Sequence, residues 1–131
     1  MKGDFDVNDI RCRGQMEGGA WVYGYFLPSA NRKVKLIVNY PDTESALPCF
    51  NIIKPETLGL SSRLYDELGE EIFEHDLLKI GGVIFEVVIE KGAFITRRTD
   101  DGGLYDDELL GSWETNVIRK VGNRFDGVRE E

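Results

Sequence analysis

The chain has 131 residues, of which 41% are hydrophobic and 31% charged, and its formal net charge is −8. This length and composition are typical of one globular domain that buries a core of its own. The acidic excess lies in residues 54–131, with ten Lys/Arg against eighteen Asp/Glu, and it disfavours non-specific binding to nucleic-acid backbones. No apolar run approaches the roughly 20 residues of a membrane-spanning helix, so we expect no membrane association.

Cysteine and histidine are scarce, and this narrows the chemistry that the chain can carry. Cys12 and Cys49 are the only cysteines, and His75 is the only histidine. Without a CxxC pair a zinc ribbon or thioredoxin-type site is excluded, and one histidine excludes two-histidine metal motifs. The first fourteen residues lack the apolar core of a signal peptide, so we expect a cytosolic protein with two unrelated thiols. We expect no cofactor and no metal.

The first half of the chain predicts a polar arm followed by a β hairpin. Residues 1–19 are polar and interrupted by glycines, which indicates a partly ordered arm with a short strand near Ile10–Arg13. Ala20–Leu27 is aromatic and β-branched and ends at a proline, while Val34–Val38 has a period of two residues. These two segments predict a hairpin. A further short strand is expected in the segment CFNIIKPET, ahead of its proline.

The second half predicts a series of short strands. Leu77–Ile80, Val83–Ile89 and Ala93–Arg97 are strand-like and are joined by short turns that contain glycine, which is a hairpin signal. Asn116–Val121 predicts a last strand, and residues 127–131 form a charged tail. Six or seven short strands with Gly-rich turns favour a small antiparallel barrel or sandwich, so the chain is expected to be mainly β.

The acidic stretch GLSSRLYDELGEEIFEHDLL, residues 59–78, is ambiguous by pattern alone. Its apolar residues recur about every four positions, which is the spacing of a helix. Gly69 interrupts that helix, and carboxylates four residues apart would repel one another. The alternative is a strand arm, a polar turn and a return arm, over Thr57–Arg63, Tyr65–Gly69 and Glu70–Phe73. Periodicity leaves the two interpretations open.

Three segments, in this order, resemble the YopX family of phage and prophage proteins. They are AWVYGYF at residues 20–26, PETLGLSSRLYDELGEEIFEHDLLKIGG at 55–82 and NVIRKVGNRFD at 116–126. The matching signature positions are Pro55, Glu56, Thr57, Gly59, Gly69, Ile72, Phe73, Glu74, Asp76, Gly122 and Asn123. The chain departs from the family pattern where Leu60, Ser62-Arg63, Leu68, His75 and Arg124 replace Gln, Thr-Gly, Asn, Gly and Ile, so it resembles a divergent member.

The resemblance implies a fold and no activity. It implies a single domain over residues 20–126, with an N-terminal β-hairpin region of some α character at 20–56 and a small SH3-like β-barrel at 57–126. It also favours the two β arms over the helix for the acidic stretch. The family has no established biochemical role to transfer.

Glu74, His75 and Asp76 are the residues that most suggest acid–base chemistry. Catalysis would need a nucleophile within hydrogen-bond reach, for which Ser61 and Ser62 are candidates by vicinity alone. The alternative is a turn in which Asp76 caps backbone N–H groups and His75 takes a positive φ, which the family's usual glycine would favour. The run TDDGGLYDDE at residues 99–108 lacks the oxygen spacing of an EF-hand, which favours a solvated loop over a calcium site.

Aromatic residues are the candidates for contact with a partner. Trp21, Tyr23 and Tyr25 share one face if the segment is a strand, where they either fill the core or form an exposed ladder. Trp113 follows Gly111-Ser112 in a weakly structured region, and we expect it to be an exposed anchor.

Three classes of function follow. The favoured one is a non-enzymatic, self-associating accessory protein of a phage or prophage, which forms a homo-oligomer in the host cytosol and binds a host or phage protein. The second is a nucleic-acid-associated protein or an acidic DNA mimic that acts on a host DNA-binding protein, although the charge makes nucleic acid an unfavourable partner. The third is a hydrolase or metal enzyme that uses Glu74, His75 and Asp76.

Overall fold

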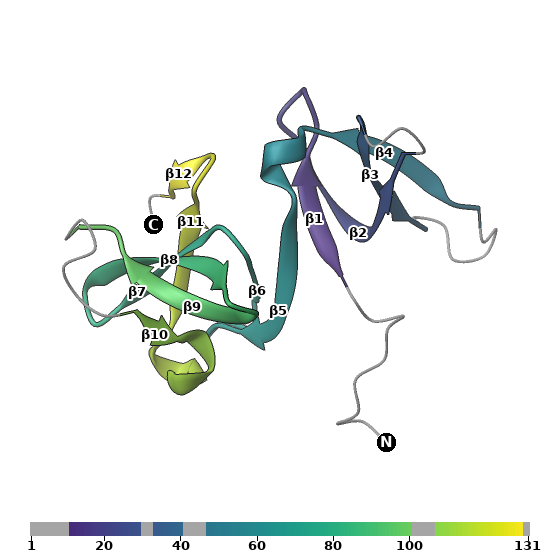
Figure 1. Cartoon of the computed structure of the whole chain (residues 1–131). Helices are drawn as coiled ribbons and strands as arrows, with labels where there is room; N and C mark the ends of the chain where they lie inside the picture. Colours follow the sequence, from purple (N-terminus) through teal and green to yellow (C-terminus); the bar gives the residue numbers. More distant parts are fainter. Residues whose placement is uncertain (1–10, 30–32, 41–46, 101–106, 130–131) are drawn as a thin grey trace, which may run out of the picture. The chain divides into compact units, whose positions relative to one another are not determined.

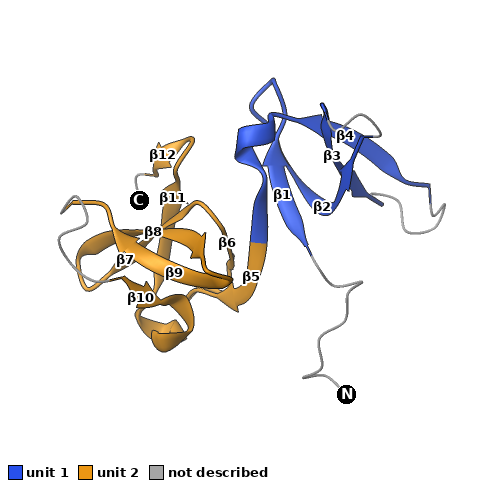
Figure 2. Cartoon of the chain, in the orientation of Figure 1, with its two compact units in different colours: residues 1–60 blue, residues 61–131 orange. Residues whose placement is uncertain are grey.

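The computed structural model describes residues 11–29, 33–40, 47–100 and 107–129 (Figure 1). These residues form β-strands and short 3-10 helices, and no α-helix is found among them, so the prediction of a mainly β chain is confirmed. The α character that the family resemblance implied is absent from the described part of residues 20–56. The chain divides into two compact units, residues 1–60 and 61–131 (Figure 2), which are described one at a time.

The first unit is an antiparallel sheet with the order β4-β3-β2-β1-β5. Its strands are β1 (Cys12–Gln15), β2 (Trp21–Pro28), β3 (Lys35–Asn39), β4 (Cys49–Ile53) and the start of β5 (Gly59–Tyr65). The predicted hairpin is therefore confirmed as β2 and β3. The later residues of β5 belong to the second unit, where they pair with β6 (Glu71–Phe73).

The core of the first unit is small and lies on one face of its sheet. Cys12, Ile37 and Ile53 are buried, and Met16, Val22 and Leu58 pack against them. β1 passes so close to this core that a Cβ on Gly14 would lie 2.2 Å from Cδ1 of Ile53. The short strand that we predicted within the N-terminal arm is thus β1, and all four of its residues are buried. It pairs with β2 on one side and with β5 on the other.

Both cysteines are free thiols, as the sequence indicated. Cys12 is buried in the core of the first unit, whereas Cys49 is exposed on β4. Burial raises the pKa of the Cys12 thiol to about 11, so this thiol stays protonated and unreactive at neutral pH.

The signature segment Pro55-Glu56-Thr57 forms a 3-10 helix that fastens the end of β4 to β1. Proline is at the first helical turn, where its missing N–H costs nothing. The buried hydroxyl of Thr57 accepts a hydrogen bond from the Gln15 N–H at 2.8 Å and donates to the Lys54 carbonyl at 2.6 Å. The Lys54 N–H in turn donates to the Gln15 carbonyl at 2.8 Å. These three residues of the segment that resembles the family therefore have a structural role, which is to connect β4 to β1.

The second unit is built on an antiparallel sheet with the order β10-β9-β8-β7-β11-β12. Its strands are β7 (Asp76–Ile80), β8 (Val83–Glu90), β9 (Ala93–Arg98), β10 (Glu108–Leu109), β11 (Arg119–Asn123) and β12 (Gly127–Val128). The predicted hairpins over β7, β8 and β9 are confirmed. Among the described residues the strand pairing does not close this sheet into a barrel.

Two boundaries differ from the sequence predictions at the C-terminal end. The last long strand starts at Arg119 instead of Asn116, because Thr115–Val117 forms a 3-10 helix. The residues Gly127 and Val128, which were expected in the charged tail, instead pair with β11 as β12. The 3-10 helix is closed by local hydrogen bonds, from the Val117 N–H to the Glu114 carbonyl and from the Ile118 N–H to the Thr115 carbonyl, whereas β12 depends on its pairing with β11.

The core of the second unit is larger and apolar. Its buried residues are Ile72, Leu78, Ile80, Phe85, Val87, Leu110 and Ile118. They come from β6, β7 and β8, from the 3-10 helix Leu110–Ser112 and from the residue before β11. The acidic stretch supplies Ile72 and Leu78 to this core from strands, so the interpretation as two β arms is confirmed and the helix is wrong. Gly69 has a φ of 83° in the turn between the arms.

Candidate functional site

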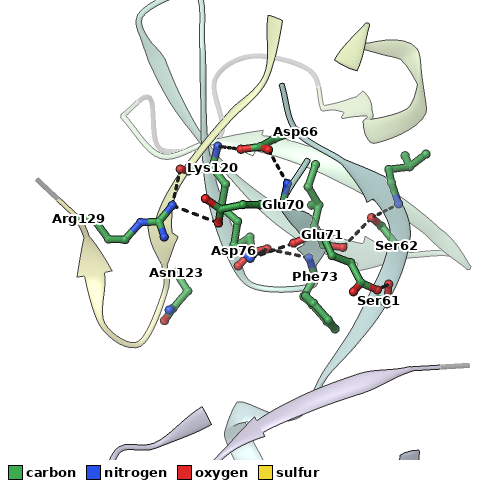
Figure 3. Close-up of polar contacts among 12 residues, drawn as sticks. Ser61, Ser62, Asp66, Glu70, Glu71, Phe73, Asp76, Lys120, Asn123 and Arg129 are labelled. Atoms are coloured by element: carbon green, nitrogen blue, oxygen red, sulfur yellow. Dashed lines mark hydrogen bonds and ion pairs between the residues drawn. The ribbon is translucent and has the colours of Figure 1, made fainter. Parts of the chain in front are cut away.

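Asp76, the aspartate of the acidic signature, is at the centre of a polar network (Figure 3). It begins β7 and is fully buried. Its Oδ2 accepts a hydrogen bond from the Phe73 N–H at 2.7 Å and lies 3.2 Å from Nζ of Lys120. The same Nζ donates to the Glu71 carbonyl at 2.9 Å. The predicted backbone cap by Asp76 is confirmed, and a buried ion pair that sequence reasoning missed accompanies it.

A second buried aspartate, Asp66, ties the turn of the acidic stretch to β11. Its Oδ1 accepts hydrogen bonds from the N–H groups of Leu68 and Glu70, both at 2.9 Å. Its Oδ2 accepts one from the Lys120 N–H, also at 2.9 Å. Arg129 extends the network from the C-terminal side, because its Nη2 donates to the Lys120 carbonyl at 2.7 Å (Figure 3). The carboxylates of Asp66 and Asp76 therefore accept hydrogen bonds from backbone N–H groups and connect neighbouring segments of the second unit.

The signature pair Gly122-Asn123 is also structural. Gly122 has a φ of 153°, and a Cβ at this position would lie 2.1 Å from the Gly127 carbonyl oxygen. Asn123 accepts hydrogen bonds at its Oδ1 from the N–H groups of Phe125 and Asp126, both at 2.9 Å. This is the geometry of an Asx turn, which reverses the chain from β11 into β12.

His75 occupies the turn between β6 and β7 with a φ of 79°, as we expected from the family's glycine at this position. Its N–H donates to the Val87 carbonyl at 2.7 Å, and its ring meets the Phe125 ring edge-on with centroids 5.2 Å apart. Arg63, the other departure at a usual glycine, also has a positive φ, of 63°. Both positions require the left-handed conformation that glycine adopts without steric cost.

Carboxylates flank the imidazole of His75. Its Nε2 lies 3.7 Å from Glu74 and its Nδ1 lies 3.8 Å from Oε2 of Glu86. Nη1 of Arg124 donates to the same Glu86 oxygen at 3.3 Å. The imidazole of His75, and then the guanidinium of Arg124, hold the pKa of the Glu86 carboxyl below its ordinary value against the effect of burial. The Glu86 carboxylate is thus stabilised in its charged form.

The serines that we considered as nucleophiles are engaged elsewhere. The Ser61 hydroxyl donates to the Glu71 carboxylate, and the Ser62 hydroxyl donates to the Ile72 carbonyl at 2.7 Å. Both bonds join β5 to β6, so the structure does not bring these hydroxyls to His75. Within the part of the chain that the structure describes, no group of His, Cys, Asp or Glu residues is placed to hold a metal ion. Most of the acidic loop at residues 99–108 lies outside that part.

Exchange of His75 tests the strain in this turn. We expect His75→Gly to be more stable than His75→Ala by about 1 kcal/mol, because both lose the imidazole but alanine keeps the cost of a positive φ. Glu74 has no positive φ, so Glu74→Gly should instead be less stable than Glu74→Ala, because glycine leaves the unfolded chain more conformational freedom to lose. Urea denaturation of the four variants measures both differences. The same order at both positions would contradict this account of the turn.

The structure corrects the expectation for Trp113. Its ring is partly buried against the core of the second unit, with its centroid 5.6 Å from that of Phe85. Its indole N–H donates to the Thr96 hydroxyl at 3.0 Å. Trp113 is therefore a core residue with a satisfied polar end, and the expectation of an exposed anchor is wrong.

The aromatic residues of β2 are divided between packing and exposure. Trp21 is half-buried, and the guanidinium carbon of the buried Arg13 lies 4.7 Å from its ring centroid. Tyr23 and Tyr25 are exposed, as one of the two interpretations of this strand required. Sequence reasoning did not foresee Arg13 as a buried stacking partner.

An apolar face of the first unit extends beyond these tyrosines. In the strand register Tyr25 pairs with Val38 and Val38 with Phe50, while Leu27 pairs with Leu36 and Leu36 with Ile52. Paired residues share one side of a sheet, so six apolar side chains form two adjacent rows across β2, β3 and β4. We call these six residues the apolar face: Tyr25, Leu27, Leu36, Val38, Phe50 and Ile52.

The apolar face is largely exposed, and it lies opposite the small core. Phe50 is 59% and Ile52 is 61% exposed, and Tyr25 and Leu27 are exposed as well. The intervening positions Ile37 and Ile53 point to the core. Sequence reasoning missed the apolar face because both sides of these strands are apolar. The signal that could have found it is the apolar composition of these neighbouring strands, which exceeds what one small core can bury.

The fold and these contacts define a mainly β protein of two antiparallel units. Comparison of the chain with family models, curated proteins and solved structures finds no significant match. In the described residues there is no helix of the length and apolar character that crossing a membrane requires.

Proposed function

We propose that this protein is a non-enzymatic binding module that associates with a second copy of itself through the apolar face. The observation that carries the proposal is the exposure of that face, whose six side chains include no charge. They expose on the order of 500 Å² on each copy, which is the size of patch that marks interaction sites on single chains. Two such patches together reach the roughly 1,000 Å² that a specific interface needs.

The charge balance of the first unit supports a second copy of the chain as the partner that covers the apolar face. Residues 1–60 carry seven Lys/Arg and seven Asp/Glu, whereas residues 61–131 carry nine against seventeen. Two first units can therefore approach each other without the repulsion that the net charge of −8 would suggest. The apolar face also buries no unpaired charge against its own copy, which is the main cost of an interface.

The resemblance of three segments to the YopX family supports an accessory role in a phage or prophage, in the cytosol of the bacterial host. On this proposal the second unit is a small SH3-like barrel, in keeping with its antiparallel strands and its single enclosed core. Signature positions such as Asp76, Gly122 and Asn123 serve the fold, and this supports a binding role over a catalytic one.

Sedimentation equilibrium of the full chain tests self-association. We expect a concentration-dependent dimer or larger oligomer, and we expect Phe50→Lys and Ile52→Lys to weaken association at least about tenfold, as loss of a buried interface side chain does. Leu68→Lys is the matched control, since Leu68 is equally exposed but lies in a turn of the second unit. A strict monomer at high concentration, or equal weakening by all three variants, would overturn the proposal.

A further inference from the structure

A small pocket opens in the first unit where β2 exchanges one partner strand for another. Residues Trp21–Gly24 of β2 pair with β1, and Tyr25–Pro28 pair with β3 on the other side. The pocket has a volume of about 250 Å³ and is lined by Arg11, Tyr23, Gly24, Tyr25, Asn39 and Tyr40. The lining comes from the residue before β1, from the exchange point of β2, and from the last residue of β3 with the residue after it.

The pocket exists because β2 and β3 separate beyond the pair Tyr25–Val38. The next residue of β3, Asn39, does not continue the pairing with β2, and its side-chain amide donates to the Tyr23 carbonyl at 3.3 Å instead. At Gly24, the first residue of β2 beyond that pair, the two backbones are still close, because a Cβ there would lie 2.2 Å from the Val38 carbonyl oxygen. The position of the pocket is thus set by the strand pairing and by the hydrogen bond of Asn39.

The pocket combines aromatic rings with a cation and an amide. Tyr23, Tyr25 and Tyr40 are 40%, 41% and 50% exposed, and they are three of the five tyrosines in the chain. Exposed rings of this kind stack on planar groups, and a guanidinium binds phosphate oxygens well. Tyrosine rings beside Arg11 therefore suit a planar ring that carries an anionic group.

We propose that this pocket binds one nucleotide, with its base against the tyrosine rings and its phosphate at Arg11. The volume is slightly below the roughly 300–1,000 Å³ of most ligand pockets, so it suits one nucleotide and not a run of bases. The nucleotide is either free or part of a single strand, since both present the same chemistry. This inference goes beyond the proposed self-association and does not rest on it, although Tyr25 belongs to both the apolar face and the pocket.

The charge of the whole chain argues against a phosphate ligand, but the charge near the pocket does not. The described residues of the first unit carry the basic side chains Arg11, Arg13, Lys33, Lys35 and Lys54 and the acidic side chains Glu17 and Glu56. The acidic excess of the chain belongs to residues 61–131. Residues 1–60 as a whole carry as many Lys/Arg as Asp/Glu, so the net charge of this unit does not repel an anion.

Calorimetric titration of the full chain tests the proposal with defined probes. They are the four ribonucleoside monophosphates, adenosine, ribose 5-phosphate and an eight-residue oligothymidylate. At least one monophosphate should bind with a stoichiometry of one per chain. Ribose 5-phosphate should bind at least tenfold more weakly than the best-binding monophosphate, and adenosine should bind at least tenfold more weakly than AMP. Tighter binding of the oligomer would indicate a strand as the source, and equal or weaker binding would indicate the free nucleotide.

Variants locate the site. Tyr40→Leu keeps apolar bulk but removes the ring, and it should weaken binding roughly tenfold or more. Arg11→Gln should weaken it and remove most of its dependence on salt, whereas Arg11→Lys should restore part of both. Tyr65→Leu, at an exposed tyrosine of the second unit, and Lys33→Gln, at an exposed cation of the first, are the matched controls. Circular dichroism establishes that each variant is folded.

Three results would overturn the proposal. The first is no binding of any monophosphate or of the oligomer at millimolar concentration. The second is equal binding of ribose 5-phosphate and the nucleotides, which would mean that charge alone is recognised. The third is equal weakening by Tyr40→Leu and Tyr65→Leu. Because Arg11 is exposed and precedes the first residue of β1, its variants stay informative even if Tyr40→Leu fails to fold.

Discussion

Replacement of Asp76 by alanine is expected to lower the free energy of unfolding of the second unit by about 3–5 kcal/mol. The change removes one partner of a buried ion pair and leaves Nζ of Lys120, whose side chain is 12% exposed, without its carboxylate. The Phe73 N–H also loses its acceptor. Urea denaturation, followed by tryptophan fluorescence from Trp113 in the core of this unit, measures the effect.

Two further variants separate the causes. Asp76→Asn keeps an acceptor for the Phe73 N–H but removes the charge, so a smaller loss than with alanine would measure the hydrogen bond. Glu90→Ala breaks an exposed ion pair, in which Oε2 of Glu90 lies 2.9 Å from Nη2 of Arg97, and should cost less than about 1 kcal/mol. Similar losses for Asp76→Ala and Glu90→Ala would contradict the account of Asp76 as a buried structural anchor.

Gly24→Ala is expected to destabilise the first unit by about 1–3 kcal/mol, as overpacking does, or by more if the backbone cannot move. The added Cβ would meet the Val38 carbonyl oxygen at 2.2 Å, where a main-chain atom has little freedom to yield. The change should separate β2 from β3 at the point where their pairing starts. Hydrogen exchange at the amides of β3, together with thermal unfolding, measures this.

Gly18→Ala is the matched control for Gly24→Ala. Gly18 has no atom within 4 Å of a built Cβ and no positive φ, so alanine there should be neutral or slightly stabilising. Faster exchange in β3 with Gly18→Ala, or unchanged exchange with Gly24→Ala, would show that close approach of the two strands does not depend on this glycine.

Local patterns were sufficient for most strands and for the turns between them. Glycines between apolar segments marked the hairpins over β7, β8 and β9, and the alternation in β3 marked its strand. The cap by Asp76 was also predicted, because a turn of this kind is decided by residues close together in the sequence, whereas the positive φ of His75 was expected from the glycine usual at this position in the family that the chain resembles. The acidic stretch needed the family resemblance, since helix and strand periodicities were both present in it.

Burial and partnership were decided by the tertiary structure. Lys120 pairs with Asp76, which is 44 positions away in the sequence. Trp113 donates a hydrogen bond to Thr96, which is also distant in the sequence. Neither contact therefore has a local sequence pattern. The apolar face and the tyrosine pocket depend on strand register, which sets the side of the sheet that each side chain takes. By itself the sequence determined which segments are strands; the pairing between distant strands decided which side chains are core, anchor or surface.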